Sequence, residues 1–283
     1  MTVPLVTATF SLGGASTGTL SAASGDNWTM DAPPSSVNAG TGYVEYAASG
    51  ALGASFGQLW QSQLPSTLAG SITVLPDGCV DVIWREGTLL VVGPDRVSAQ
   101  PHLPPGAHVL GLRFLPGQAH AALGIALDQL VGQAVPLAEF TRTGVEALSQ
   151  RIGSATPGER LRTLAAGMAG ILDSSDVLRS RQAAAVFNAL RTGEAELDCL
   201  TARLALSPRT LRRLCQQQFG YGPKTLQRIL RLQRFLHLSR RAPGQTLAGL
   251  AAAAGYADQS HLSRDARELT LMGAAVLRRN HGV

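Results

Sequence analysis

Short apolar runs separated by turn residues fill residues 43–114 and are typical of antiparallel strands. Asp77-Gly78 is expected to form a hairpin turn, with the Cys79 side chain packed inside. The strands are expected over residues 43–46, 71–75, 80–84, 88–92 and 108–114.

Apolar positions recur at helical spacing after residue 117. In the last stretch before the carboxy-terminal third, Val186, Phe187 and Leu190 share one face. A polar run, Asp173 to Asp176, is expected to cap that helix and to mark a domain boundary. These helices are expected over residues 118–123, 127–131, 145–152, 159–172 and 177–190.

The patterns divide the chain into three parts. Residues 1–42 are rich in Ser, Thr, Gly and Ala, contain no Lys or Arg, and are expected to form a poorly ordered arm. Residues 43–173 form a small β-rich domain with helices, interpreted as a sensor or dimerisation domain. Residues 177–283 predict an all-α domain of two tandem helix-turn-helix units, so the fold class is α+β.

The first helix-turn-helix pattern covers about residues 197–219. Ser207 is a good N-cap, and Pro208 suits the first helical position because its missing N–H would have no helical partner there. In the helix that follows, Leu211, Leu214 and Cys215 turn toward the core. The outer positions, expected to contact DNA, are Arg209, Thr210, Arg212, Arg213 and Gln216.

The second pattern covers about residues 246–269, with Asp258 as the N-cap. Leu262, Ala266 and Leu269 face inward, and Asp265 and Glu268 are expected to pair with Arg264 or neighbouring arginines on the same helix. The outer positions, also expected to contact DNA, are Gln259, Ser260, His261, Ser263, Arg264 and Arg267.

A predicted linker helix over residues 224–238 joins the two units. Its part from Thr225 to Leu238, about fourteen residues, spans roughly 20 Å at 1.5 Å each. Major grooves on one face of DNA repeat every ~34–36 Å, so such a spacer can set two readers in successive grooves, or bend the DNA if it falls short. Arg231 on this helix is expected to contact a phosphate.

Charge separates the same parts. The chain has 24 Lys+Arg and 19 Asp+Glu, but from residue 200 onward there are 14 basic and 3 acidic residues, a net of +11. The preceding residues carry a net of −6. A basic carboxy-terminal module of this kind favours a polyanion, most simply double-stranded DNA.

At these residues the chain resembles the AraC/XylS family of bacterial transcription regulators. The matching elements are the run from Leu200 to Leu214, the Phe219-Gly220 and Pro223 turn, Arg231-Leu232, and the run from Gly255 to Arg264. The resemblance implies that the outer residues of both recognition helices touch DNA. Ala205 and Leu271 stand where that family usually has glycine.

Residues 75–84, 93–94 and 111–117 also resemble an uncharacterised β-rich domain found beside AraC-type modules. Either Cys79 is a packing residue in a turn, or a pocket lies here with Trp84 or Phe114 as its apolar wall. The polar groups offered to a small-molecule effector would be Asp77, Cys79, Asp81, Arg85, His102 and Arg113.

Other chemistry at this domain finds less support in the sequence. Cys79, Asp81, His102 and His108 do not fall at a recognised metal-ligand spacing. Nucleophilic catalysis at Cys79 would need a partner base, and no histidine lies nearby in sequence. We therefore expect no catalytic group, no metal and no cofactor.

The preferred interpretation is a sequence-specific DNA-binding transcription regulator controlled by a small molecule or by dimerisation. Its partners would be double-stranded DNA, an effector or a second copy of the chain, and RNA polymerase if it activates. Without a signal sequence or a long apolar stretch, a cytoplasmic protein with no membrane partner is expected. The alternatives are an enzyme with a DNA-targeting tail and a nonspecific architectural binder.

Overall fold

The computed structural model describes part of the chain: residues 21–22, 28–29, 36–38, 42–64, 66, 70–71, 73–141, 143–171, 177–193 and 197–281. The expected arm at 1–42 and the expected cap at 173–176 lie largely or wholly outside these residues. Within 1–42, three short strands are described, and the third pairs with the strand that begins at Tyr43.

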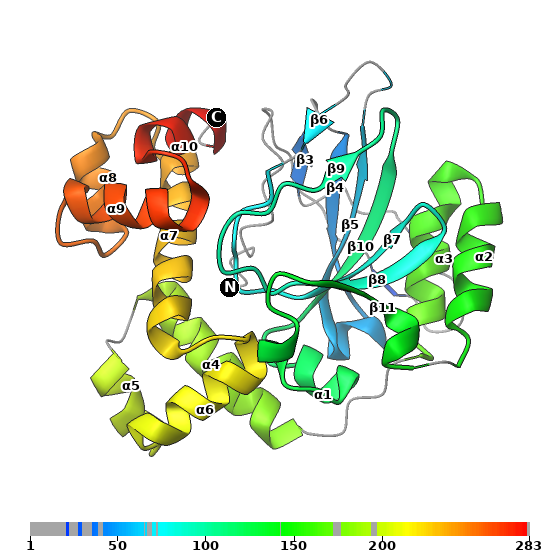
Figure 1. The fold of residues 1–283 in the computed structure, drawn as a ribbon, viewed down its shortest axis with the longest axis horizontal. Helices are drawn as coiled ribbons and strands as arrows, with labels where there is room; N and C mark the ends of the chain where they lie inside the picture. Colours follow the sequence, from blue (N-terminus) through cyan, green and yellow to red (C-terminus); the bar gives the residue numbers. More distant parts are fainter. Residues whose placement is uncertain are drawn as a thin grey trace.

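An antiparallel sheet of seven strands forms the amino-terminal part (Figure 1). Its strand order is β11-β8-β7-β10-β5-β4-β3. The strands are β3 (Ser36–Asn38), β4 (Tyr43–Ala47), β5 (Phe56–Gln63), β7 (Asp81–Arg85), β8 (Thr88–Val92), β10 (His108–Phe114) and β11 (Ala134–Pro136). Two further pairs are β1 (Ser21–Ala22) with β2 (Trp28–Thr29), and β6 (Gly70–Ser71) with β9 (His102–Leu103).

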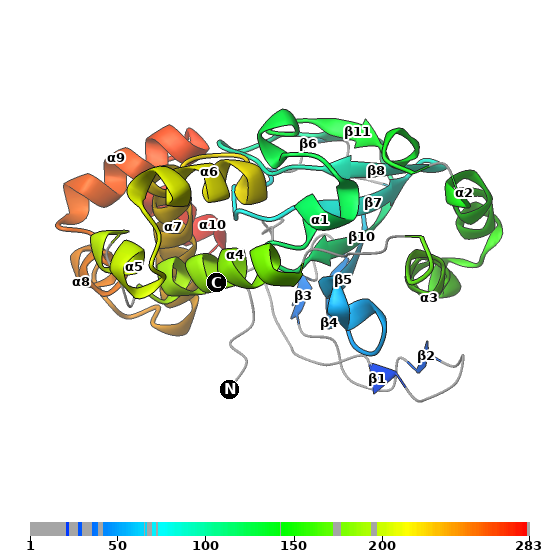
Figure 2. The same cartoon turned by 90° about the horizontal axis from the view of Figure 1, so that it is seen from below.

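Helices cover one face of this sheet, where α2 and α3 pack against the central strands (Figures 1 and 2). Leu110, Leu112 and Trp84 point into this layer and are buried with the apolar side chains of both helices. The elements are η1 (Leu52–Ala54), α1 (Ala119–Leu123), η2 (Leu127–Gln129), η3 (Leu137–Glu139), α2 (Val145–Ser154) and α3 (Pro157–Met168).

The carboxy-terminal helices are arranged around the long helix α7, with α4, α5 and α6 near one end and α8, α9 and α10 near the other (Figure 1). They bury a second core that includes Phe187, Phe219 and Phe235. The helices are α4 (Val177–Thr192), α5 (Leu197–Arg203), α6 (Pro208–Phe219), α7 (Pro223–Arg241), α8 (Leu247–Ala253), α9 (Gln259–Thr270) and α10 (Ala274–His281).

Two expectations for the β-rich part were wrong, and one long strand was missed. Residues 71–75 do not form one strand, because β6 ends at Ser71 and Val74 makes only an isolated bridge to Ala99. Asp77-Gly78 does not close a hairpin, because Val74 before this loop bridges to Ala99, whereas β7 after it pairs with β8 and β10. The eight-residue strand β5 was not predicted at all.

The caps of both recognition helices are as predicted. The Ser207 hydroxyl accepts from the Thr210 N–H at 3.1 Å, and the Asp258 carboxyl accepts from the His261 N–H at 2.7 Å. The linker helix α7 is longer than predicted, 19 residues, and so spans about 28 Å.

Two residues that stand in place of the family's glycines adopt left-handed backbone conformations. Ala205 has φ of 50° in the turn between α5 and α6, and Leu271 has φ of 60° at the end of α9. This conformation costs a residue with a side chain about 1–2 kcal/mol.

Leu271→Gly is expected to raise the free energy of unfolding by about 0.5–1 kcal/mol. The Leu271 side chain is 82% exposed, so little apolar contact is lost, while the left-handed strain is removed. Denaturant titration would measure the change. Ala252→Gly, at an exposed right-handed position of α8, is the control and should lower stability by about 1 kcal/mol. The same sign at both positions would contradict the strain argument.

Candidate nucleic-acid interface and adjoining cavity

The outer face of α6 carries exposed cations. Arg209, Arg212 and Arg213 are exposed, while Thr210 and Gln216 are half-buried. Leu211, Leu214 and the other apolar residues of α6 are buried. The Thr210 hydroxyl lies 2.9 Å from the Ser207 hydroxyl, which makes Thr210 part of the cap as well as of the outer face.

The outer face of α9 has the same character. Gln259, Ser260, Arg264 and Arg267 are exposed, and His261 and Ser263 are half-buried. The ring of His261 stands edge-on to that of Tyr256, with centroids 5.3 Å apart.

The acidic residues of α9 pair differently from the sequence prediction. Asp265 is buried, and its Oδ1 accepts from Arg228 Nε on α7 at 2.9 Å. Glu268 also pairs with Arg228. The expected pairing within α9 was wrong because the partner comes from a helix 37 residues earlier. This arrangement leaves the exposed Arg264 and Arg267 unmasked.

The arginines of α7 have different surroundings. Arg231 lies over the ring of Tyr256, 5.3 Å from its centroid, and is partly exposed. Arg234 is turned inward and donates to the carbonyls of Leu190 and Arg191 on α4, and of Ala254 after α8. Arg234 therefore ties the first unit's supporting helix to the second unit.

Comparisons with known families agree with this geometry. Residues 200–280 match the model of a helix-turn-helix domain. The chain carries an AraC-type DNA-binding domain at its carboxy-terminal end. Residues 44–136 match a domain of unknown function (DUF6597). A search of curated proteins found no match.

Solved structures resemble the chain more loosely. A probable AraC family transcriptional regulator from Rhodopseudomonas palustris is 24% identical over 36% of this chain and 98% of that one, with a TM-score of 0.31. ToxT from Vibrio cholerae O395 is 10% identical over 80% and 98%, with a TM-score of 0.42. The AraC-like activator CuxR is 14% identical over 75% and 86%, with a TM-score of 0.26.

A cavity of about 380 Å³ lies on the sheet face opposite α2 and α3. Five of the six proposed pocket residues line it: Asp77, Cys79, Asp81, Arg85 and Arg113. The sixth, His102, is exposed and is not part of its lining.

The aromatic wall is not the one expected from the sequence. Trp84 and Phe114 point to the opposite face of the sheet, into the layer of α2 and α3. The wall is Trp60 of β5, whose ring covers Gly111 of β10. A Cβ on Gly111 would lie 2.1 Å from Trp60 Cε2, so the ring can lie there only because residue 111 has no side chain.

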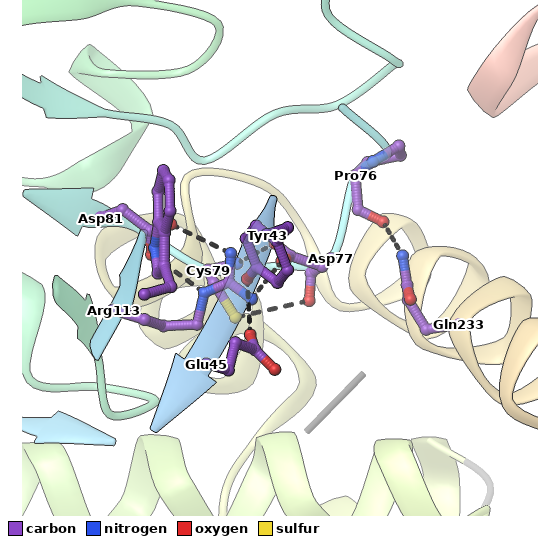
Figure 3. A network of polar contacts seen from close by, with 9 residues as sticks. Tyr43, Glu45, Pro76, Asp77, Cys79, Asp81, Arg113 and Gln233 are labelled. Carbon is purple, nitrogen blue, oxygen red and sulfur yellow. Dashed lines mark hydrogen bonds and ion pairs between the residues drawn. The ribbon is translucent and has the colours of Figure 1, made fainter. Parts of the chain in front are cut away.

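The floor of the cavity is a buried ionic network (Figure 3). Arg113, only 3% exposed, donates to Asp81 at 2.9 and 3.0 Å and pairs with Asp77 Oδ2 at 3.0 Å. Trp60 Nε1 donates to Asp81 Oδ2 at 3.1 Å. Burial opposes the Arg113 charge, but both carboxylates outweigh it and hold the pKa of Arg113 well above its usual value.

The Cys79 thiol lies in the same network. Burial, followed by the negative charge of Asp77, raises the pKa of Cys79 well above its usual value. A thiol that keeps its proton is a poor nucleophile, so the site does not favour covalent catalysis. Within the described part of the chain, no group of three or more His, Cys, Asp or Glu residues is placed to hold a metal ion.

Asp95 was missed as a pocket residue. It lies just beyond β8, lines the cavity, and is half-buried. Burial, then the negative charges of Asp77 and Asp81, raises the pKa of Asp95 to about 6. Only its position beside the turn Gly93-Pro94 is visible in sequence, because the other carboxylates come from distant positions.

Two segments that line the cavity also touch the AraC-type domain. In the first, residues 75–79, the Pro76 carbonyl accepts from Gln233 Nε2 of α7 at 2.8 Å (Figure 3). A Cβ on Gly78 would lie 3.1 Å from Phe187 and 3.2 Å from Leu226, so the loop packs closely against α4 and α7.

The second segment, residues 93–101, reaches the carboxy-terminal ends of both recognition helices. A Cβ on Gly220, the C-cap of α6, would lie 2.8 Å from Pro94 Cγ. Ser98 donates from its N–H to the Leu269 carbonyl at 2.8 Å and from its hydroxyl to the Thr270 carbonyl at 3.1 Å, both in the last turn of α9. One loop thus contacts the ends of both α6 and α9.

Among the residues that the structure describes, no helix is both long and apolar enough to cross a lipid bilayer.

Proposed function

We propose that this protein is a sequence-specific regulator of transcription that reads double-stranded DNA with α6 and α9. The observation that carries the proposal is the pair of capped helices with exposed Arg, Gln and Ser faces, attached to one continuous helix. Arginine can grip guanine O6 and N7, and glutamine can grip adenine N6 and N7, in the major groove. The polar, base-capable faces favour sequence-specific reading over architectural binding.

The contacts divide into two kinds. Arg212 on α6 and Arg264 on α9 are exposed on the outer faces and are assigned to base edges. Arg231 on α7, held over Tyr256, is assigned to a phosphate. Base contacts specify the sequence, while phosphate contacts only position the protein.

This division gives a direct test. Sequences bound by the full chain are first selected from a random DNA pool, and dissociation constants are then measured over all single-base variants of the site. Arg212→Ala and Arg264→Ala should each cost about 1–3 kcal/mol and relax preference at one position. Arg231→Ala should weaken binding on every sequence and flatten the salt dependence by about one unit. Equal losses on every sequence for all three variants would contradict the proposal.

We further propose that occupancy of the cavity controls DNA binding. Support comes from the loop 93–101, which lines the cavity and also donates a hydrogen bond to the last turn of α9. A ligand that shifts this loop changes the relative placement of two readers that must fit one duplex.

Dimerisation through the amino-terminal domain is the other mode of control. Sedimentation of the full chain with and without DNA distinguishes the two modes. A dimer that forms only on DNA favours assembly control, whereas a monomer in both conditions favours the cavity. If the regulator activates, RNA polymerase is the further partner.

A further inference from the structure

The cavity is mainly apolar, with a set of charged groups at one side. Its apolar lining includes the buried Trp60, Ile83 and Val109, which belong to one cluster on this face of the sheet. Its charged lining consists of three carboxyls and two guanidiniums: Asp77, Asp81, Asp95, Arg85 and Arg113. A ligand therefore needs an apolar body and a polar group that can pair with a charged residue of the cavity that has no protein partner.

The buried cation is already neutralised. Arg113 is shared between Asp81, with two hydrogen bonds, and Asp77, with an ion pair at 3.0 Å. An anionic ligand would have to compete with two carboxylates for one guanidinium. Arg85 is the remaining cation, 29% exposed and 3.9 Å from Glu86, and it is the group that would serve an anion if one bound.

The charged group of the cavity that lacks a described protein partner is the carboxyl of Asp95. Among the described residues, Asp95 lines the cavity but makes no hydrogen bond or ion pair, and the charges that act on it are those of the Asp77 and Asp81 carboxyls. A half-buried carboxylate without a counter-ion is unfavourable, so a cation placed beside it would gain electrostatic energy without displacing a protein partner.

We propose that the cavity is a binding site for a small organic cation, with its ammonium group beside Asp95 and its apolar body against Trp60. The volume of about 380 Å³ suits a compound with one ring and a short side chain. Binding stands on the cavity alone, while the role of the cation as an effector rests on the proposed function. Bound there, it contacts the loop that reaches both α6 and α9.

Three probes of similar shape and different charge test the proposal: 2-phenylethylamine, 2-phenylethanol and phenylacetate. Calorimetric titration of the full chain should show that the amine binds at least tenfold more tightly than the other two. Asp95→Asn should weaken amine binding at least tenfold, an effect of the size of one charge pair. The control Glu146→Gln, an exposed acid on α2, should leave it unchanged. Thermal unfolding of each variant shows that it is folded.

The pH dependence gives a second readout. With a pKa of about 6, Asp95 is about one-tenth ionised at pH 5 and almost fully ionised at pH 7.5. The amine stays charged over this range, so its affinity should rise about tenfold and the rise should be absent in Asp95→Asn. Asp77 and Asp81 act on Asp95, and Asp95 in turn acts on Tyr221. The other titratable groups of the cavity are Cys79, Arg85 and Arg113, and the variant separates the titration of Asp95 from theirs.

Each other outcome has a defined meaning. Equal binding of all three probes, or amine binding that Asp95→Asn does not change, overturns the proposal. Phenylacetate binding that is lost in Arg85→Gln would assign an anion site instead and also overturns it. DNA affinity measured with saturating amine tests separately whether the amine binds and whether its binding controls DNA affinity. A bound amine that leaves DNA affinity unchanged supports the cation site and contradicts effector control, and a chain that binds DNA but no amine contradicts only the cation site.

Discussion

Replacing Arg113 with leucine is expected to lower the free energy of unfolding by about 3–5 kcal/mol. The guanidinium is 3% exposed and is the cation closest to Asp77 and Asp81, which are themselves nearly buried. Without it, two carboxyls that lay within 3.0 Å of the guanidinium stay in a poorly solvated site, and the neutral Trp60 indole still donates to Asp81 but supplies no positive charge. The loss exceeds that of an ordinary hydrogen bond because an unpaired buried charge keeps its full desolvation cost.

Denaturant unfolding at pH 7 measures this loss. Arg85→Leu is the matched control, because it changes the same residue type on the same face of the sheet at a partly exposed position. It should cost less than about 1 kcal/mol. Adding Asp77→Asn and Asp81→Asn to Arg113→Leu should recover much of the stability, since no buried charge is then left over. A similar loss in both single variants would show that the network is not the cause.

Local features of the carboxy-terminal part were predictable from the sequence. The N-caps Ser207 and Asp258 bond to residues three positions away, so the information lies within one helical turn. The buried faces of α6 and α9 follow from helical spacing for the same reason. The left-handed turn at Ala205 was visible only through the family's glycine.

Pairing between distant elements was not predictable. Asp265 was expected to pair with an arginine of its own helix, but it pairs with Arg228 of α7, and no spacing rule within one helix can find that partner. The strand β5 was missed because Gln58, Gln61 and Gln63 obscure its alternation, while its position is fixed by β10 about fifty residues later.

The alternation of side chains along a strand predicts some residues of the cavity but not all of them. Side chains alternate along a strand, so Asp81, Ile83 and Arg85 share one face of β7 and Trp84 must point to the other. The prediction of Trp84 as a wall was therefore wrong for a reason that this alternation already contains. The wall in the structure is Trp60, whose ring lies over Gly111 because residue 111 has no side chain. The sequence does not show that these two residues are neighbours, because this depends on how β5 pairs with β10.

Arg234→Lys is expected to lower the free energy of unfolding by about 2–3 kcal/mol and to reduce DNA affinity about tenfold. The guanidinium donates to three carbonyls at 2.7–3.0 Å, two at the end of α4 and one after α8, so it holds the two helix-turn-helix units in a fixed relation. Lysine keeps the charge but has no planar fork, and one ammonium group cannot span both helix ends.

The DNA effect separates this role from a general loss of folding. On a selected site that engages both α6 and α9, Arg234→Lys should bind about tenfold more weakly than the unchanged chain. On a site in which one half is scrambled, the two proteins should bind alike, since a single reader does not depend on the spacing. Arg241→Lys, at the exposed end of the same helix, should match the unchanged chain on both sites. An equal loss on both sites would mean that Arg234 contributes to each reader separately and not to the rigid connection between them.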